Sequence, residues 1–192
     1  LKQNLIDGLS KKEFILSKFL VVASFAVAST IFVFIMSLIL GYSFSSYNEL
    51  SIVFTDLEYL FAFFIKLFAF FSFCLFLGIL VKRSAFALGF LFVWFVAENI
   101  IYWIIKFVIL GGDDKHKNFG DTIIQYFPIE AMSNLVKEPI TRLSAIKTIE
   151  NAVGGAQVAK DYSIHFSQIS IVLVWTFIFI LTSYYILKKR DL

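Results

Sequence analysis

The chain begins with LKQNLIDGLSKKEFILSKFL (1–20), a stretch of mixed polar and apolar residues that runs directly into VVASFAVASTIFVFIMSLILGY (21–42), where no residue is charged. Crossing the ~30 Å hydrocarbon core of a bilayer as a helix takes about 20 apolar residues, because each residue rises ~1.5 Å. The sequence from 19 to 42 therefore predicts a membrane-spanning helix, preceded by a short amphipathic segment.

That amphipathic segment, residues 1–10, is predicted to lie in the membrane interface, because a helix there would carry its apolar side chains on one face. These side chains are Leu1, Leu5, Ile6 and Leu9. Gly8 can end this helix. Ser10 and Glu13 have the spacing of a capping box, in which each side chain accepts a hydrogen bond from a backbone N–H of the other residue. A new helix is therefore predicted to begin at Lys11 and to continue into the membrane.

Composition supports a membrane protein throughout. Hydrophobic residues make up 59% of the chain and charged residues 16%, and the mean hydropathy is +0.84, which excludes an ordinary soluble domain. Three further apolar segments are long enough to span a bilayer: 57–81, 84–110 and 166–187. The predicted fold is all-α, a polytopic helical membrane protein with four transmembrane helices.

The charges predict an orientation. The two ends of the chain and the turn between the second and third spans carry nine basic and three acidic residues, whereas the opposite side carries six basic and ten acidic residues. Because short loops rich in Lys and Arg stay inside, both ends of the chain are expected in the cytoplasm. The net charge of +3 reflects this orientation, so no nucleic-acid partner is expected.

The external segment, 111–165, contains two candidate helical stretches, 121–134 and 140–153, and the second has apolar residues at helical spacings of three and four. Pro128 suits the first turn of the first helix. We expect two short amphipathic helices that lie on the outer face or dip into the membrane. An exposed loop with frayed helices is the alternative that the sequence leaves open.

Two charged residues lie well inside predicted spans, Lys66 in the second and Glu98 in the third. A charge at the bilayer centre costs ~3 kcal/mol or more and usually needs a partner. If the second and third spans are antiparallel around Arg83, the two residues lie at nearly the same depth, which predicts an ion pair between them. The alternative is that Lys66 extends toward the interface and Glu98 is protonated or reaches water.

No catalytic, cofactor-binding or metal site is predicted. Ser, His and carboxylate residues lack the spacing of a nucleophilic triad, and His116 and His165 are isolated in the external segment. Cys74 is the single cysteine, so no disulfide within the chain is available. The chain also lacks a Gly-x-x-x-x-Gly-Lys-Ser/Thr phosphate loop, so any nucleotide chemistry would belong to another polypeptide.

Two stretches resemble a known family. Residues 4–18, NLIDGLSKKEFILSK, look like the cytoplasmic loop of ABC-2-type ABC transporter permeases, in which a coupling helix leads into a spanning helix. The end of the chain, LKKRDL (187–192), is similar to the tail that closes many of these permeases. The resemblance implies six spanning helices of the type V exporter kind, of which the four seen here match the third to sixth. The chain is therefore expected to be a fragment that lacks its natural N-terminus and the first two spanning helices.

The resemblance also implies a function. The whole chain, 1–192, would be one transmembrane permease domain of an ATP-driven transporter in the bacterial inner membrane, with efflux as the expected direction. It implies no enzyme activity in this chain, ATP and Mg on a partner ATPase subunit, and a second permease chain, identical or homologous. The coupling residues would be Asp7, Gly8, Leu9, Ser10, Lys11, Lys12 and Glu13. The cargo is not specified.

A second class of protein stays open at this point. A polytopic membrane enzyme or assembly factor outside the ABC transporters would use residues 1–20 only as an interfacial anchor. Association with an ATPase would distinguish the two hypotheses.

Overall fold

The computed structural model describes residues 10–44, 57–81, 84–105, 107, 122–136 and 163–189. Its elements, in chain order, are α2 (Lys11–Phe44), α4 (Leu57–Val81), α5 (Ser84–Ile104), α7 (Pro128–Leu135) and α9 (Phe166–Lys189). The described residues contain no strand, so the predicted all-α class is confirmed. Residues 1–9 of the predicted coupling helix and the predicted helix over 140–153 lie outside the described residues.

Four of these helices are long and apolar enough to cross a membrane: Lys11–Phe44, Leu57–Val81, Ala85–Ile104 and Phe166–Lys189. They overlap the four predicted spans. The first helix starts at Lys11, as the capping box predicted, and the third ends at Ile104, before the predicted end at 110. The 34 residues of the first helix rise about 50 Å, more than the ~30 Å of the hydrocarbon core, so this helix extends beyond the apolar layer.

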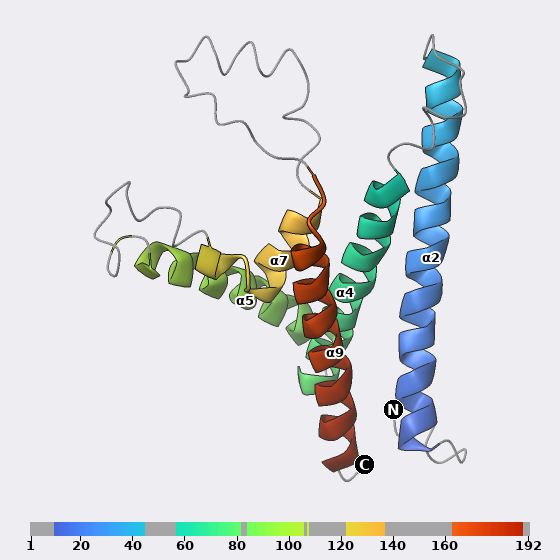
Figure 1. The fold of residues 1–192 in the computed structure, drawn as a ribbon. Coiled ribbons are helices and arrows are strands. Elements are labelled where there is room, and N and C mark those ends of the chain that lie inside the picture. Colours follow the sequence, from blue (N-terminus) through green and yellow to red (C-terminus); the bar gives the residue numbers. More distant parts are fainter. Residues whose placement is uncertain are drawn as a thin grey trace.

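Helix α4 is the central element, in contact with α2, α5, α7 and α9 (Figure 1). Its buried face repeats every three or four residues, as a helix packed along one side requires: Ala62, Ile65, Ala69, Phe73 and Leu77. Phe73 packs on Phe179 of α9, with ring centroids 4.8 Å apart. The small residues on this face let the neighbouring helices approach closely, which favours packing between helices in a membrane.

A second apolar cluster joins the start of α2 to the end of α9. Phe14, Ile15 and Phe19 pack there against Leu187. The Lys11 ammonium also donates a hydrogen bond to the Lys188 carbonyl oxygen at 3.4 Å. The start of α2 and the end of α9 therefore lie at the same end of the bundle (Figure 1).

Helix α5 departs from the predicted arrangement. The equal depth predicted for Lys66 and Glu98 requires α5 to run antiparallel beside α4, but Figure 1 shows α5 leaving α4 at a steep angle, with its far end directed away from α2 and α9. The short helix α7 packs against α4, α5 and α9. Because α5 diverges, the equal-depth argument for Lys66 and Glu98 no longer places the two side chains together.

Candidate functional site

The capping box at the start of α2 is confirmed. The Ser10 N–H donates to Glu13 Oε2 at 2.8 Å, and the Glu13 N–H donates to Ser10 Oγ at 3.2 Å. Glu13 precedes the apolar stretch that begins at Phe19. The hydrogen bonds from the side chain and the backbone of Ser10 hold the pKa of the Glu13 carboxyl below its usual value. The helix therefore has a defined beginning at its exposed end.

The described part of the predicted coupling segment is polar and accessible. Ser10, Lys12 and Glu13 are exposed, and Lys11 reaches the end of α9. Lys18 lies over the ring of Phe14, 5.4 Å from the ring centroid. The structure thus brings the residues from 10 to 13 together with the last turn of α9, while Asp7, Gly8 and Leu9 lie outside the described residues.

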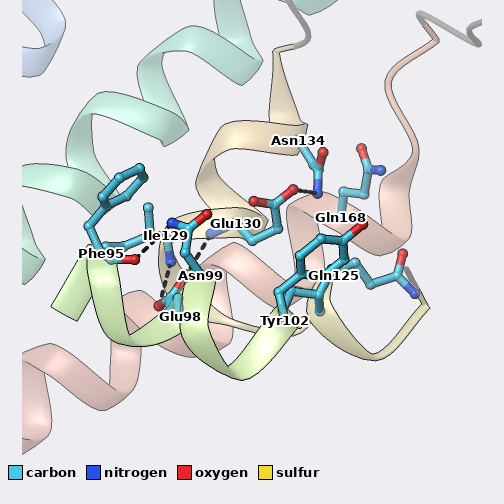
Figure 2. Close-up of a pocket in the computed structure, with 10 residues that line it drawn as sticks. Phe95, Glu98, Asn99, Tyr102, Gln125, Ile129, Glu130, Asn134 and Gln168 are labelled. Atoms are coloured by element: carbon cyan, nitrogen blue, oxygen red, sulfur yellow. Dashed lines mark hydrogen bonds between the residues drawn. The ribbon is translucent and has the colours of Figure 1, made fainter. Parts of the chain in front are cut away.

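Glu98 binds the beginning of α7. Its Oε1 accepts hydrogen bonds from Trp94 Nε1 at 2.6 Å and from the Ile129 N–H at 3.2 Å, and its Oε2 accepts one from the Glu130 N–H at 3.3 Å (Figure 2). The residue before this helix, Phe127, has no side chain that can cap it. A carboxylate at this end satisfies free N–H groups and complements the positive end of the helix dipole.

Lys66 binds the other end of α7. Its ammonium donates to the carbonyl oxygens of Ser133 at 3.5 Å and Val136 at 3.4 Å. A cation here satisfies carbonyl groups that have no partner within the helix and complements its negative end.

The hypothesis of a direct ion pair between Lys66 and Glu98 is therefore replaced. Each residue finds its partners on α7, at opposite ends of the helix, and the described residues show no ion pair between the two. The physical reason is the divergence of α5, which leaves room for α7, together with the unsatisfied backbone groups that α7 offers to both charges. We refer to the arrangement of Lys66, α7 and Glu98 as the α7 clamp.

A polar pocket of about 500 Å³ lies beside the α7 clamp, where α5, α7 and the start of α9 meet (Figure 2). Its lining consists of Phe95, Glu98, Asn99, Tyr102, Ile124, Gln125, Ile129, Glu130, Asn134 and Gln168. Asn134 Nδ2 donates to Glu130 Oε1 at 3.1 Å, and Asn99 Nδ2 donates to the Phe95 carbonyl oxygen at 2.9 Å. Two carboxylates line this pocket, and none of its lining residues is basic.

Several contributors to this site were not predicted from the sequence. Trp94 lies four residues before Glu98, a spacing that places both on one helix face, and this was the available signal. Trp175 of α9 donates from Nε1 to the Tyr126 carbonyl oxygen at 2.7 Å and fixes the approach to α7. Gln168 carried no signal, because a single glutamine at the start of an apolar helix is also typical of a membrane boundary.

Metal chemistry finds no support among the residues that the structure describes. They contain no group of three or more His, Cys, Asp or Glu side chains placed to hold a metal ion. His165 lies next to Ser163, with 3.4 Å between its Nε2 and the serine Oγ.

The architecture is that of a multi-pass membrane protein, with four spanning helices and a capped helix start beside the chain's C-terminal end. A family model described as ABC-2 family transporter protein matches residues 3–192, and the chain therefore belongs to this family. A search of curated proteins and a search of solved structures each found no match.

Membership in this family defines the chain as an ABC transporter permease, the membrane subunit of a transport system. The alternative hypothesis, a polytopic protein outside the ABC transporters, is therefore wrong. The family model covers the stretches on which the resemblance was first based, 4–18 and 187–192.

Proposed function

We propose that this permease carries out ATP-driven efflux across the bacterial inner membrane, powered by a separate ATPase subunit that binds ATP and Mg. Two permease chains, identical or homologous, would enclose the path. The observation that carries the proposal is the family match, together with a rigidly capped helix start whose polar residues are exposed at one end of the bundle.

The start of α2 is suited to transmit a displacement caused by a partner protein. A helix whose first turn is capped transmits displacement along its axis instead of fraying. The hydrogen bond from Lys11 to Lys188 and the cluster of Phe14, Ile15 and Phe19 with Leu187 tie this start to α9. Movement of residues 7–13 would therefore shift α2 and α9 together.

A displacement of α9 would directly affect the polar pocket. Helix α9 packs along α4 and against α7, and Gln168 near its start lines the pocket. These packed contacts support a mechanism in which the ATPase cycle, entering at residues 7–13, alters the surroundings of α7.

The coupling proposal is tested by co-purification and ATP hydrolysis. The full-length permease is expressed with its candidate ATPase, and residues 7–13 are replaced by a Gly/Ser segment of equal length. We expect the replacement to reduce co-purified ATPase at least tenfold. Glu58→Gln, an exposed change at the opposite end of the bundle, is the matched control and should leave the complex intact. Unchanged co-purification of the replaced segment would contradict the proposal.

The direction of transport needs its own experiment. Cells with an intact ATPase are compared with cells whose ATPase cannot hydrolyse ATP, and small molecules inside and outside are measured by mass spectrometry. Efflux predicts at least one compound that is enriched inside and depleted outside when hydrolysis is blocked. The opposite distribution would indicate import.

A further inference from the structure

The polar pocket has an excess of hydrogen-bond acceptors. Glu98 receives three N–H donors, whereas the Glu130 carboxylate receives one hydrogen bond, from Asn134 to Oε1, among the described residues. The Gln168 Oε1 atom, on another lining side chain, is buried and has no hydrogen-bond partner. Since a buried acceptor without a donor is costly, Gln168 Oε1 favours a ligand that brings a hydrogen-bond donor into this pocket.

The charge of the pocket is also unbalanced. Glu98 and Glu130 both line it, and the backbone N–H of Glu130 is itself bound to the Glu98 carboxylate. The nearest described intramembrane cation on α4, Lys66, is committed to the opposite end of α7. A ligand that enters between the two carboxylates therefore gains most if it is positively charged.

We propose that this pocket binds an organic ammonium ion, a primary or secondary amine carried on an apolar body. The ammonium would donate to the Glu130 carboxylate and to Gln168 Oε1, and the apolar body would lie against Phe95 and Tyr102. Ring faces of Phe and Tyr attract cations as well as apolar groups, which favours this class of ligand.

A bare metal ion fits less well. The volume of about 500 Å³ lies within the range of small-molecule pockets and is far larger than one ion needs. The two oxygens of the Glu98 carboxylate already accept hydrogen bonds from three N–H donors, and the described residues contain no group of three metal-ligating side chains. A pocket lined by both hydrogen-bond acceptors and aromatic side chains is the pattern expected for an organic cation.

The test uses dansylcadaverine, a fluorescent primary alkylammonium, added to the full-length permease in lipid nanodiscs. Its N-acetyl derivative has the same apolar body without the positive charge and is the matched ligand control. Binding is measured by the change in dansyl fluorescence and polarisation. We expect saturable binding of dansylcadaverine and at least tenfold weaker binding of the acetylated compound.

Variants then locate the site. Glu130→Gln keeps an acceptor for Asn134 but removes the negative charge, and it should weaken dansylcadaverine binding about tenfold or more, as loss of a charge-assisted hydrogen bond implies. Gln168→Leu should weaken it less. Glu58→Gln removes an exposed carboxylate that does not line the pocket and should leave binding unchanged. Glu98→Gln is not the primary variant, because it also weakens the contact that holds α7.

Three outcomes would overturn the inference. These are equal binding of the acetylated compound, equal binding by Glu130→Gln in a protein with an unchanged melting temperature, and competition by millimolar Mg²⁺ or Ca²⁺ that removes the signal at constant ionic strength. The inference goes beyond the proposed function, because binding is measured without ATPase. Failure here would therefore leave the coupling experiment unaffected, and failure of co-purification would leave this result standing.

Discussion

Lys66 of α4 and Glu98 of α5 bind opposite ends of the same eight-residue helix, α7. The ammonium donates hydrogen bonds to the last carbonyl oxygens, and the carboxylate accepts hydrogen bonds from the first amide N–H groups. Each charge thus matches the sign that the helix dipole requires at its end. Two residues on different spanning helices are linked through backbone groups instead of through each other.

Charge reversal distinguishes this arrangement from a direct ion pair. In a direct pair, the double variant Lys66→Glu with Glu98→Lys restores the attraction. In the α7 clamp, the double variant places the wrong charge at both ends of α7, so it should be less stable than either single variant. Thermal unfolding in detergent, followed by tryptophan fluorescence, measures this. A double variant more stable than both single variants would restore the direct pair.

Trp94→Phe removes the shortest hydrogen bond to Glu98, the one of 2.6 Å. Hydrogen bonds to a charged group contribute roughly 1.5–3 kcal/mol, so we expect a destabilisation of about 2 kcal/mol. Trp103→Phe is the matched control, because Trp103 lies on the same helix and is 53% exposed. Reversible unfolding in mixed micelles provides the measurement, and equal effects of the two changes would contradict the role of Trp94.

Ser10→Ala breaks the capping box at the start of α2. Loss of an N-cap side chain costs about 1 kcal/mol, which should increase opening of the first turn about fivefold. Hydrogen exchange at the amide of Glu13, which donates to Ser10 Oγ, is the measurement. Ser10→Asp supplies another capping oxygen and should preserve protection. If alanine leaves the exchange rate unchanged, the cap does not stabilise this turn.

The pH dependence of the same turn follows from Glu13. Its folded pKa is lowered, from the usual value of 4.5, first by the hydrogen bond with the Ser10 side chain and then by the one with the Ser10 backbone. The contribution of the carboxylate is therefore complete above about pH 4.5 and is lost as the pH falls through the lower folded pKa. Protection of the first turn should be constant from pH 8 to pH 5 and decline below pH 4. In Glu13→Gln this decline should be absent.

The predicted orientation can be tested by cysteine accessibility. In a Cys74→Ser background, Ser10→Cys and Ser163→Cys place single thiols near opposite ends of α9, the first beside its last turn and the second before its start. Cytoplasmic chain ends predict that a membrane-impermeant maleimide labels position 163 in spheroplasts and position 10 in inverted vesicles. The reverse pattern would overturn the orientation derived from the Lys and Arg distribution.

The sequence was sufficient for the elements that depend on local pattern. Uninterrupted apolar runs predicted the four spanning helices, Ser10 and Glu13 predicted where α2 begins, and Pro128 predicted the start of α7. Each of these depends on residues close together in the chain, where spacing and length carry the information.

The α7 clamp could not be predicted in the same way. The prediction that Lys66 and Glu98 lie at the same membrane depth required α5 to pack antiparallel beside α4. A run of apolar residues does not specify the angle at which a helix leaves its neighbour. The partners of both charges are backbone groups of α7, which any sequence would supply. Phe127 gave one indication in retrospect, since a helix that starts after a residue unable to cap it needs a hydrogen-bond acceptor from elsewhere for its free N–H groups.

The α7 clamp also limits how the helices can rearrange. If α5 separated from α4, α7 could stay with only one of them, and the charged side chain on the other would lose its partners on α7, at a cost of ~3 kcal/mol or more in apolar surroundings. While α7 stays between α4 and α5, the Lys66 ammonium and the Glu98 carboxylate both keep these partners. Helices α4, α5 and α7 are therefore expected to move as one rigid body. Conformational changes during transport would then occur between this unit and the other helices of the bundle.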